Sequence, residues 1–122
     1  MMTCVPDAPP ARLSPTPERE ILRLIDSGVP VLVLFTGDWC GACRATVPLF
    51  EEAAARDPGS LRYVLADVER CEGLAADAGV SRLPAAVLFL DGADEAALSG
   101  RFTRAELARL VALASRRVAA PG

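Results

Sequence analysis

The chain has 122 residues, a length that suits one domain with its own core and is too short for two. Its hydrophobic share of 52% and charged share of 24% are typical of a folded protein, which argues against disorder beyond the ends of the chain. The formal net charge of -3 gives no basic field for nucleic acid, and no apolar run approaches the roughly 18 residues that span a bilayer, so we expect no binding to nucleic acid or membrane.

The beginning of the chain is rich in proline. Five of the ten prolines lie within the first 17 residues, which predicts a flexible or extended leader over residues 1–15 and a folded domain over residues 16–122. The leader has neither the charged nor the apolar region of a secretory signal. We therefore expect a cytoplasmic location, where disulfides are mostly transient and catalytic.

Helices and strands alternate after the leader. Thr16-Pro17-Glu18 is typical of a helix start, with Thr16 as the N-cap, and predicts a helix that runs to Ser27 and stops at Gly28. The continuous apolar run over residues 29–36 predicts a strand that is buried on both faces, at the centre of a sheet. A second helix is expected over residues 40–56.

The second half of the chain predicts further strands and helices. Residues 61–67 and 85–90 have the pattern of strands, and a short helix over residues 71–78 separates them. Asp91-Gly92 predicts a turn into a short strand over residues 96–99. The last helix is expected to open with a capping box at residues 103–106. Its predicted buried stripe consists of Leu107, Leu110, Val111 and Ala114.

The pentapeptide Trp39-Cys40-Gly41-Ala42-Cys43 places two thiols three positions apart between the first strand and the second helix. In open α/β sheets the reactive site lies beyond the carboxyl ends of the strands, at a helix N-terminus that favours an anion. Cys40 would occupy this position, so we expect its pKa to lie below the roughly 8.5 of a free thiol. Cys43 would lie one turn deeper. This asymmetry predicts that Cys40 attacks a target disulfide and that Cys43 resolves the mixed disulfide.

The residues around this motif resemble the thioredoxin family from Thr16 to the end of the chain. Pro48 follows Cys43 by five residues and matches the proline that kinks the family's active-site helix, while Leu83-Pro84 matches its cis-proline. The resemblance implies a thioredoxin-like three-layer α/β/α sandwich with a central mixed sheet. It also implies a protein-disulfide reductase with no metal and no cofactor apart from its own redox-active disulfide, acting as a monomer.

The resemblance further implies the partners of this reductase and the surface that meets them. The partners are disulfide-containing proteins and an external electron donor such as a thioredoxin reductase. A cis X-Pro bond presents the preceding backbone to a strand-like ligand, here at Leu83. Gly92 and Gly100 match two further glycines of the family. The implied substrate surface consists of Trp39, Gly41, Ala42, Leu83, Pro84 and Gly100, with Arg82 at its rim.

Several residues depart from the family pattern. Leu34 and Leu65 stand where thioredoxins usually have a buried Asp and a Lys. A more apolar pocket raises the pKa of a buried thiol, so we expect Cys43 to resolve mixed disulfides more slowly unless water or Asp38 assists. Ala42 replaces the proline between the cysteines, which should change the reduction potential. Ala85 replaces the usual Thr after the cis-proline, which bears on partner recognition.

Two alternatives to a reductase remain open from the sequence. The first is a non-catalytic adaptor that binds a partner in the cis-proline groove. The second is a zinc site, in which only Cys4 and Cys71 are available to complete the tetrahedral set with Cys40 and Cys43. Cys71 itself is interpreted either as a regulatory thiol or as a small buried hydrophobe.

Overall fold

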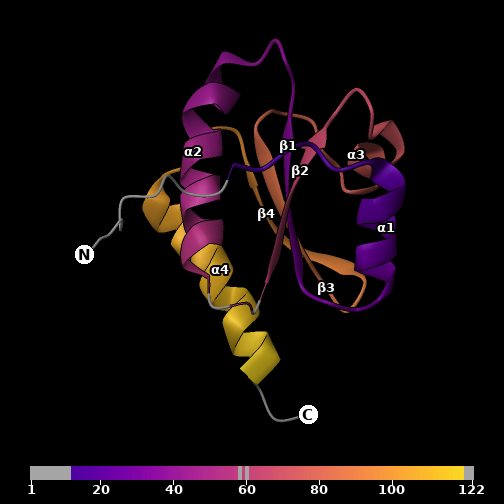
Figure 1. Ribbon diagram of the computed structural model, residues 1–122, viewed down its shortest axis with the longest axis vertical. Coiled ribbons are helices and arrows are strands. Elements are labelled where there is room, and N and C mark those ends of the chain that lie inside the picture. Colours follow the sequence, from indigo (N-terminus) through magenta and orange to yellow (C-terminus); the bar gives the residue numbers. More distant parts are fainter. Residues whose placement is uncertain (1–11, 58, 60, 120–122) are drawn as a thin grey trace, which may run out of the picture.

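A mixed four-stranded sheet forms the centre of the protein (Figure 1). The computed structural model describes residues 12–57, 59 and 61–119 of the chain. For residues 117–119 it describes the backbone alone. Its strands are β1 (Val31–Thr36), β2 (Arg62–Asp67), β3 (Ala85–Leu90) and β4 (Ala93–Ser99), in the order β2-β1-β3-β4. β1 pairs in parallel with β2 and antiparallel with β3, which confirms its predicted central place.

Helices cover both faces of this sheet. They are α1 (Glu18–Asp26), α2 (Gly41–Arg56), α3 (Glu72–Asp77) and α4 (Arg104–Ala119). α1 and α3 lie on one face, and α2 and α4 lie on the other (Figure 1). The predicted three-layer α/β/α sandwich is therefore confirmed. None of the described helices is long and apolar enough to cross a membrane.

The pattern of β1 follows from this layering. Because side chains alternate across a strand, Val31, Val33 and Phe35 pack against the α1 and α3 face, while Leu32 and Leu34 pack against the α2 and α4 face. A strand covered on both sides has no polar face, which explains the continuous apolar run in the sequence. β1 thus forms a rigid base for the loop that follows it.

The hairpin and the last helix refine the sequence predictions. Asp91 and Gly92 both have positive φ, 53° and 84°, and form a two-residue turn, so pairing begins at once between Leu90 and Ala93. β4 therefore covers Ala93–Ser99, not only residues 96–99. The predicted capping box is confirmed, because the Thr103 N–H donates to Glu106 Oε1 at 2.8 Å and the Glu106 N–H donates to Thr103 Oγ1 at 3.1 Å.

The segment before α1 makes tertiary contacts that correct one prediction. Pro17, not Thr16, is the N-cap of α1, because its carbonyl accepts the first helical hydrogen bond, from the Ile21 N–H at 3.1 Å. The Thr16 N–H donates to the carbonyl of Leu65 at 2.8 Å. The Leu13 N–H donates to Glu51 Oε2 at 2.8 Å. Residues 1–11 of the expected leader lie outside the described residues, and the domain boundary stays a prediction.

Candidate active site

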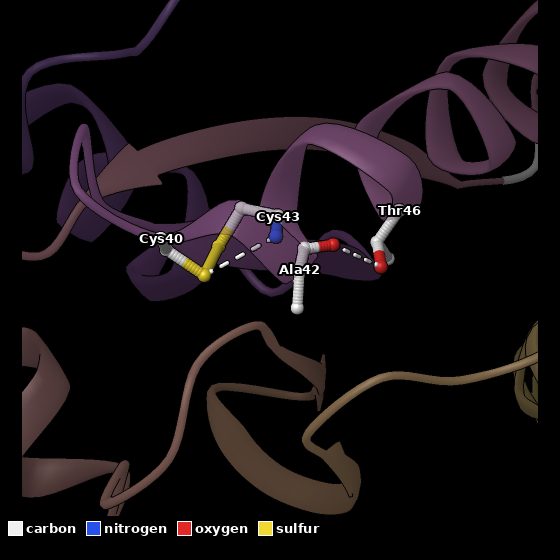
Figure 2. The surroundings of a disulfide bond; sticks show 4 residues. All are labelled: Cys40, Ala42, Cys43 and Thr46. Carbon is white, nitrogen blue, oxygen red and sulfur yellow. Dashed lines mark hydrogen bonds between the residues drawn. A yellow bond between two sulfur atoms is a disulfide. The ribbon is translucent and has the colours of Figure 1, made fainter.

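The dithiol motif lies where the chain leaves the carboxyl end of β1 and enters α2. Cys40 is the N-cap of α2, with extended backbone angles of φ -92° and ψ 104°. Its Sγ accepts a hydrogen bond from the Cys43 N–H at 3.2 Å (Figure 2). The first sulfur of the motif therefore faces a backbone donor of the first helical turn, as the sequence predicted.

Cys40 and Cys43 are joined by a disulfide, and their Cα atoms are 5.3 Å apart. Both side chains are nearly buried, with exposed fractions of 7% and 3%. A surface hollow of about 450 Å³ opens beside the pair. It is lined by Thr36, Gly37, Asp38, Cys40, Cys43, Arg44, Val47 and Pro48. The disulfide is thus reached from one side, along the start of α2.

One buried polar residue, Thr46, lies in the next turn of α2 and was missed by the sequence reasoning. It is the one buried polar or charged residue in the described part of the chain, with an exposed fraction of 1%. Its hydroxyl donates to the Ala42 carbonyl at 2.9 Å (Figure 2). Its place three residues after Cys43, on the inward side of an amphipathic helix, was the available signal. Thr46 therefore connects its own turn of α2 to the turn that carries the disulfide through a side-chain hydrogen bond.

Trp39 forms an exposed platform next to the disulfide. Its exposed fraction is 67%, and its Nε1–H donates to Glu69 Oε2 at 3.3 Å. A β-carbon on Gly37 would lie 3.1 Å from the Trp39 ring and 3.3 Å from Leu83 Cδ1. Gly37 therefore lets Trp39 and Leu83 approach each other. Sequence reasoning missed Glu69, because it meets Trp39 from the loop after β2.

The cis-proline segment lies against the end of β4. The Leu83–Pro84 bond is cis, as the resemblance implied. The Pro84 carbonyl accepts a hydrogen bond from the Gly100 N–H at 2.7 Å, and the exposed Arg82 side chain lies over Gly100. The structure therefore brings Arg82, Leu83, Pro84 and Gly100 together, while Leu83 links this group to Trp39.

Cys71 lies apart from this site. It is fully buried in the core between α1, α3 and the sheet, whereas α2 with the disulfide covers the opposite face. Burial raises the pKa of the Cys71 thiol, and the carboxylates of Glu18 and Asp67 raise it further. The described residues contain no group of three or more metal-binding side chains, and Cys4 lies outside them. Cys71 is not placed to complete a zinc site with the disulfide pair.

A cysteine pair at the N-terminus of the helix that follows a central strand, together with a cis-proline directly before the neighbouring strand β3, is typical of a thiol-disulfide oxidoreductase. Residues 18–113 match the family model named Thioredoxin. The chain belongs to the thioredoxin family, which confirms the family and the fold expected from the sequence. It is therefore a thiol-disulfide oxidoreductase with protein-disulfide reductase activity.

Individual relatives agree with this assignment. Over 88 residues the chain is 34% identical to thioredoxin C-2 of Corynebacterium nephridii, which covers 72% of the chain and 82% of the relative. Over 91 residues it is 32% identical to the thioredoxin of Pseudomonas aeruginosa, covering 75% and 82%. A solved mutant thioredoxin from Halobacterium salinarum superposes with a TM-score of 0.72 at 28% identity, covering 85% of this chain and 90% of that one.

Proposed function

We propose that Cys40 is the nucleophile and Cys43 the resolving thiol of this reductase. The observation that carries the proposal is the place of Cys40 at the N-cap of α2, with its sulfur accepting the Cys43 N–H. In the reduced protein the same donor and the helix dipole favour a thiolate at Cys40. Cys43 is one turn further along the helix and more deeply buried, which suits a thiol that reacts only with its neighbour.

The reaction follows from these positions. The Cys40 thiolate bonds to one sulfur of the target disulfide, whose S–S bond breaks and whose other sulfur leaves as a thiolate. Cys43 then loses its proton and attacks the Cys40 sulfur, which forms the Cys40–Cys43 disulfide and releases the second target thiolate. Two electrons pass to the target, and its two thiolates take up protons. An external electron donor, such as a thioredoxin reductase, returns the pair to the dithiol.

The substrate is proposed to pair with the backbone of Leu83. Pro84 already uses its carbonyl to accept the Gly100 N–H, whereas the backbone of Leu83 makes no hydrogen bond within the described part of the chain. An extended segment of a target protein gains hydrogen bonds there by strand addition. The proposed surface is the one implied by the resemblance: Trp39, Gly41, Ala42, Leu83, Pro84 and Gly100, with Arg82 at the rim. A monomeric state and a cytoplasmic location stay predictions.

Replacing the resolving thiol tests this assignment and the adaptor alternative together. A Cys43→Ser variant should lose turnover in an insulin reduction assay and accumulate mixed disulfides through Cys40. The matched Cys40→Ser variant keeps the buried thiol and should trap far less target. If the wild-type protein binds targets but reduces none with a chemical donor, the adaptor is correct and the proposed roles are wrong.

A further inference from the structure

Arg82 packs against Gly100, next to the cis-proline Pro84. A β-carbon on Gly100 would lie 2.9 Å from Arg82 Cδ, 3.7 Å from Cγ and 3.6 Å from Nη1. The methylene stem of Arg82 therefore lies flat over Gly100, which is itself buried, while the residue as a whole stays exposed. This contact with Gly100 restricts the rotamers open to the Arg82 stem, which lowers the entropy that the side chain would lose on binding.

The guanidinium of Arg82 has no partner within the described part of the chain. The ion pairs found there join Glu52 to Arg56 and to Arg104, and Arg82 takes part in neither an ion pair nor a hydrogen bond with a described residue. Arg101, directly after Gly100, is also exposed and has no described partner. Two cations without a partner in the described part of the chain therefore flank Gly100.

Charges of both signs lie near Trp39 and the disulfide. Glu69 accepts a hydrogen bond from the Trp39 indole, and the exposed Asp38 lines the hollow beside the disulfide. Arg44 also lines that hollow. The proposed substrate surface is thus positive beside Gly100 and mixed beside Trp39. A segment that pairs with Leu83 passes the positive side within one or two residues, given a rise of about 3.3 Å per residue in a strand.

We propose that Arg82 selects target disulfides that carry a carboxylate side chain one or two residues from the reacting cysteine. This inference rests on the proposed function, since it assumes that targets lie along Leu83. The guanidinium presents several N–H donors in a planar fork that matches a carboxylate. Its charge has no partner among the described residues and its stem packs against Gly100, so an acidic target residue gains a charge-assisted contact that a neutral residue does not.

The test compares three synthetic disulfide peptides that differ only at the positions flanking the cysteine, which hold Glu, Gln or Lys. For the wild-type protein, kcat/KM should follow the order Glu, Gln, Lys, with about two- to fivefold between Glu and Gln, as for an exposed ion pair. Added salt should reduce this ratio. Arg82→Gln should abolish the preference for Glu, Arg82→Lys should keep part of it, and Arg82→Glu should reverse it toward Lys. The matched control is Arg23→Gln, an exposed arginine on α1.

Different results would contradict the role of Arg82 and the proposed roles of Cys40 and Cys43. Equal kcat/KM for the three peptides with the wild-type protein would overturn the role of Arg82 and leave the proposed function intact. The role of Arg82 would also be overturned if Arg82→Gln, like Arg23→Gln, kept the wild-type ratio of kcat/KM between the Glu and Gln peptides. Absence of any turnover by the wild-type protein would overturn the proposed function, and the role of Arg82 with it.

Discussion

Leu34 and Leu65 offer a direct test of the apolar layer between the sheet and α2. They pair in register across β1 and β2, and both belong to the core on the α2 and α4 face. Their exposed fractions are 0% and 5%. Leu34 and Leu65, the two main departures from the family pattern, therefore occupy neighbouring positions on adjacent strands. The test replaces Leu34 by Asp, first alone and then together with Leu65→Lys.

The expected loss of stability for Leu34→Asp is the sum of the lost burial of Leu34, the cavity and the desolvation of the carboxylate. Removing a fully buried Leu side chain loses about 1.5–3 kcal/mol of transfer free energy, and the partial cavity adds to this loss. Desolvating the new carboxylate costs several kcal/mol more. The sum of about 5 kcal/mol approaches the whole free energy of unfolding of a typical domain, about 5–15 kcal/mol. Leu34→Asn, which has the same size and no charge, should lose only about 3 kcal/mol.

The charge on the new carboxylate should make stability depend on pH. Burial raises the pKa of the folded-state Asp above its unfolded value of about 3.9. Stability is then greatest below the unfolded pKa and falls as the pH rises toward the folded pKa, because the folded state holds the extra proton. We expect Leu34→Asp to approach the stability of Leu34→Asn at low pH and to fall below it at neutral pH.

Urea unfolding of the wild type, Leu34→Asp, Leu34→Asn, Leu65→Lys and the Leu34→Asp/Leu65→Lys double variant provides the measurement. If the two side chains meet, the opposite charges should recover about 3 kcal/mol in the double-mutant cycle. A coupling below about 0.5 kcal/mol would show that positions 34 and 65 do not face each other. Equal stability of Leu34→Asp and Leu34→Asn at neutral pH would refute the claim that the layer is apolar and dry.

Two further predictions concern Cys71 and the start of α4. Because burial raises the pKa of Cys71, iodoacetamide should modify it at least about tenfold more slowly in the native protein than in urea at the same pH, and equal rates would contradict its placement in the core. Thr103→Ala removes the hydroxyl that accepts the Glu106 N–H, so the unfolding temperature should fall by a few degrees, corresponding to about 1 kcal/mol. Thr16→Ala, at the position that proved not to be the N-cap, serves as its control and should lack this capping loss.

Most of the fold could be predicted from the sequence because its signals are local. The continuous apolar run that became β1, the proline and acid at the start of α1, and the capping box of α4 each depend on neighbours in the chain. The place of Cys40 at a helix N-terminus followed from the same strand-to-helix junction. These features required no knowledge of the tertiary structure.

The remaining features depend on contacts between distant segments. Thr16 has the right chemistry for an N-cap, but its backbone pairs with distant Leu65 and the first helical hydrogen bond is accepted by Pro17. The Trp39–Glu69 hydrogen bond and the contact between Arg82 and Gly100 each join different elements. The first half of β4 has an exposed pattern, so its sequence lacks the alternation of a half-buried strand.

The apolar core around Leu34 and Leu65 bears on how the Cys43 thiol loses its proton. With Leu34 and Leu65 in the core, Thr46 is the one buried polar residue in the described part of the chain, and its hydroxyl is engaged with the Ala42 carbonyl. Under the proposed mechanism, the Cys43 proton then leaves through the hollow beside the disulfide, where solvent can accept it. Resolution without a buried base prolongs the mixed disulfide. A longer-lived mixed disulfide gives the target more time to settle against the groove, which is why a rim contact such as that of Arg82 can decide which targets are reduced.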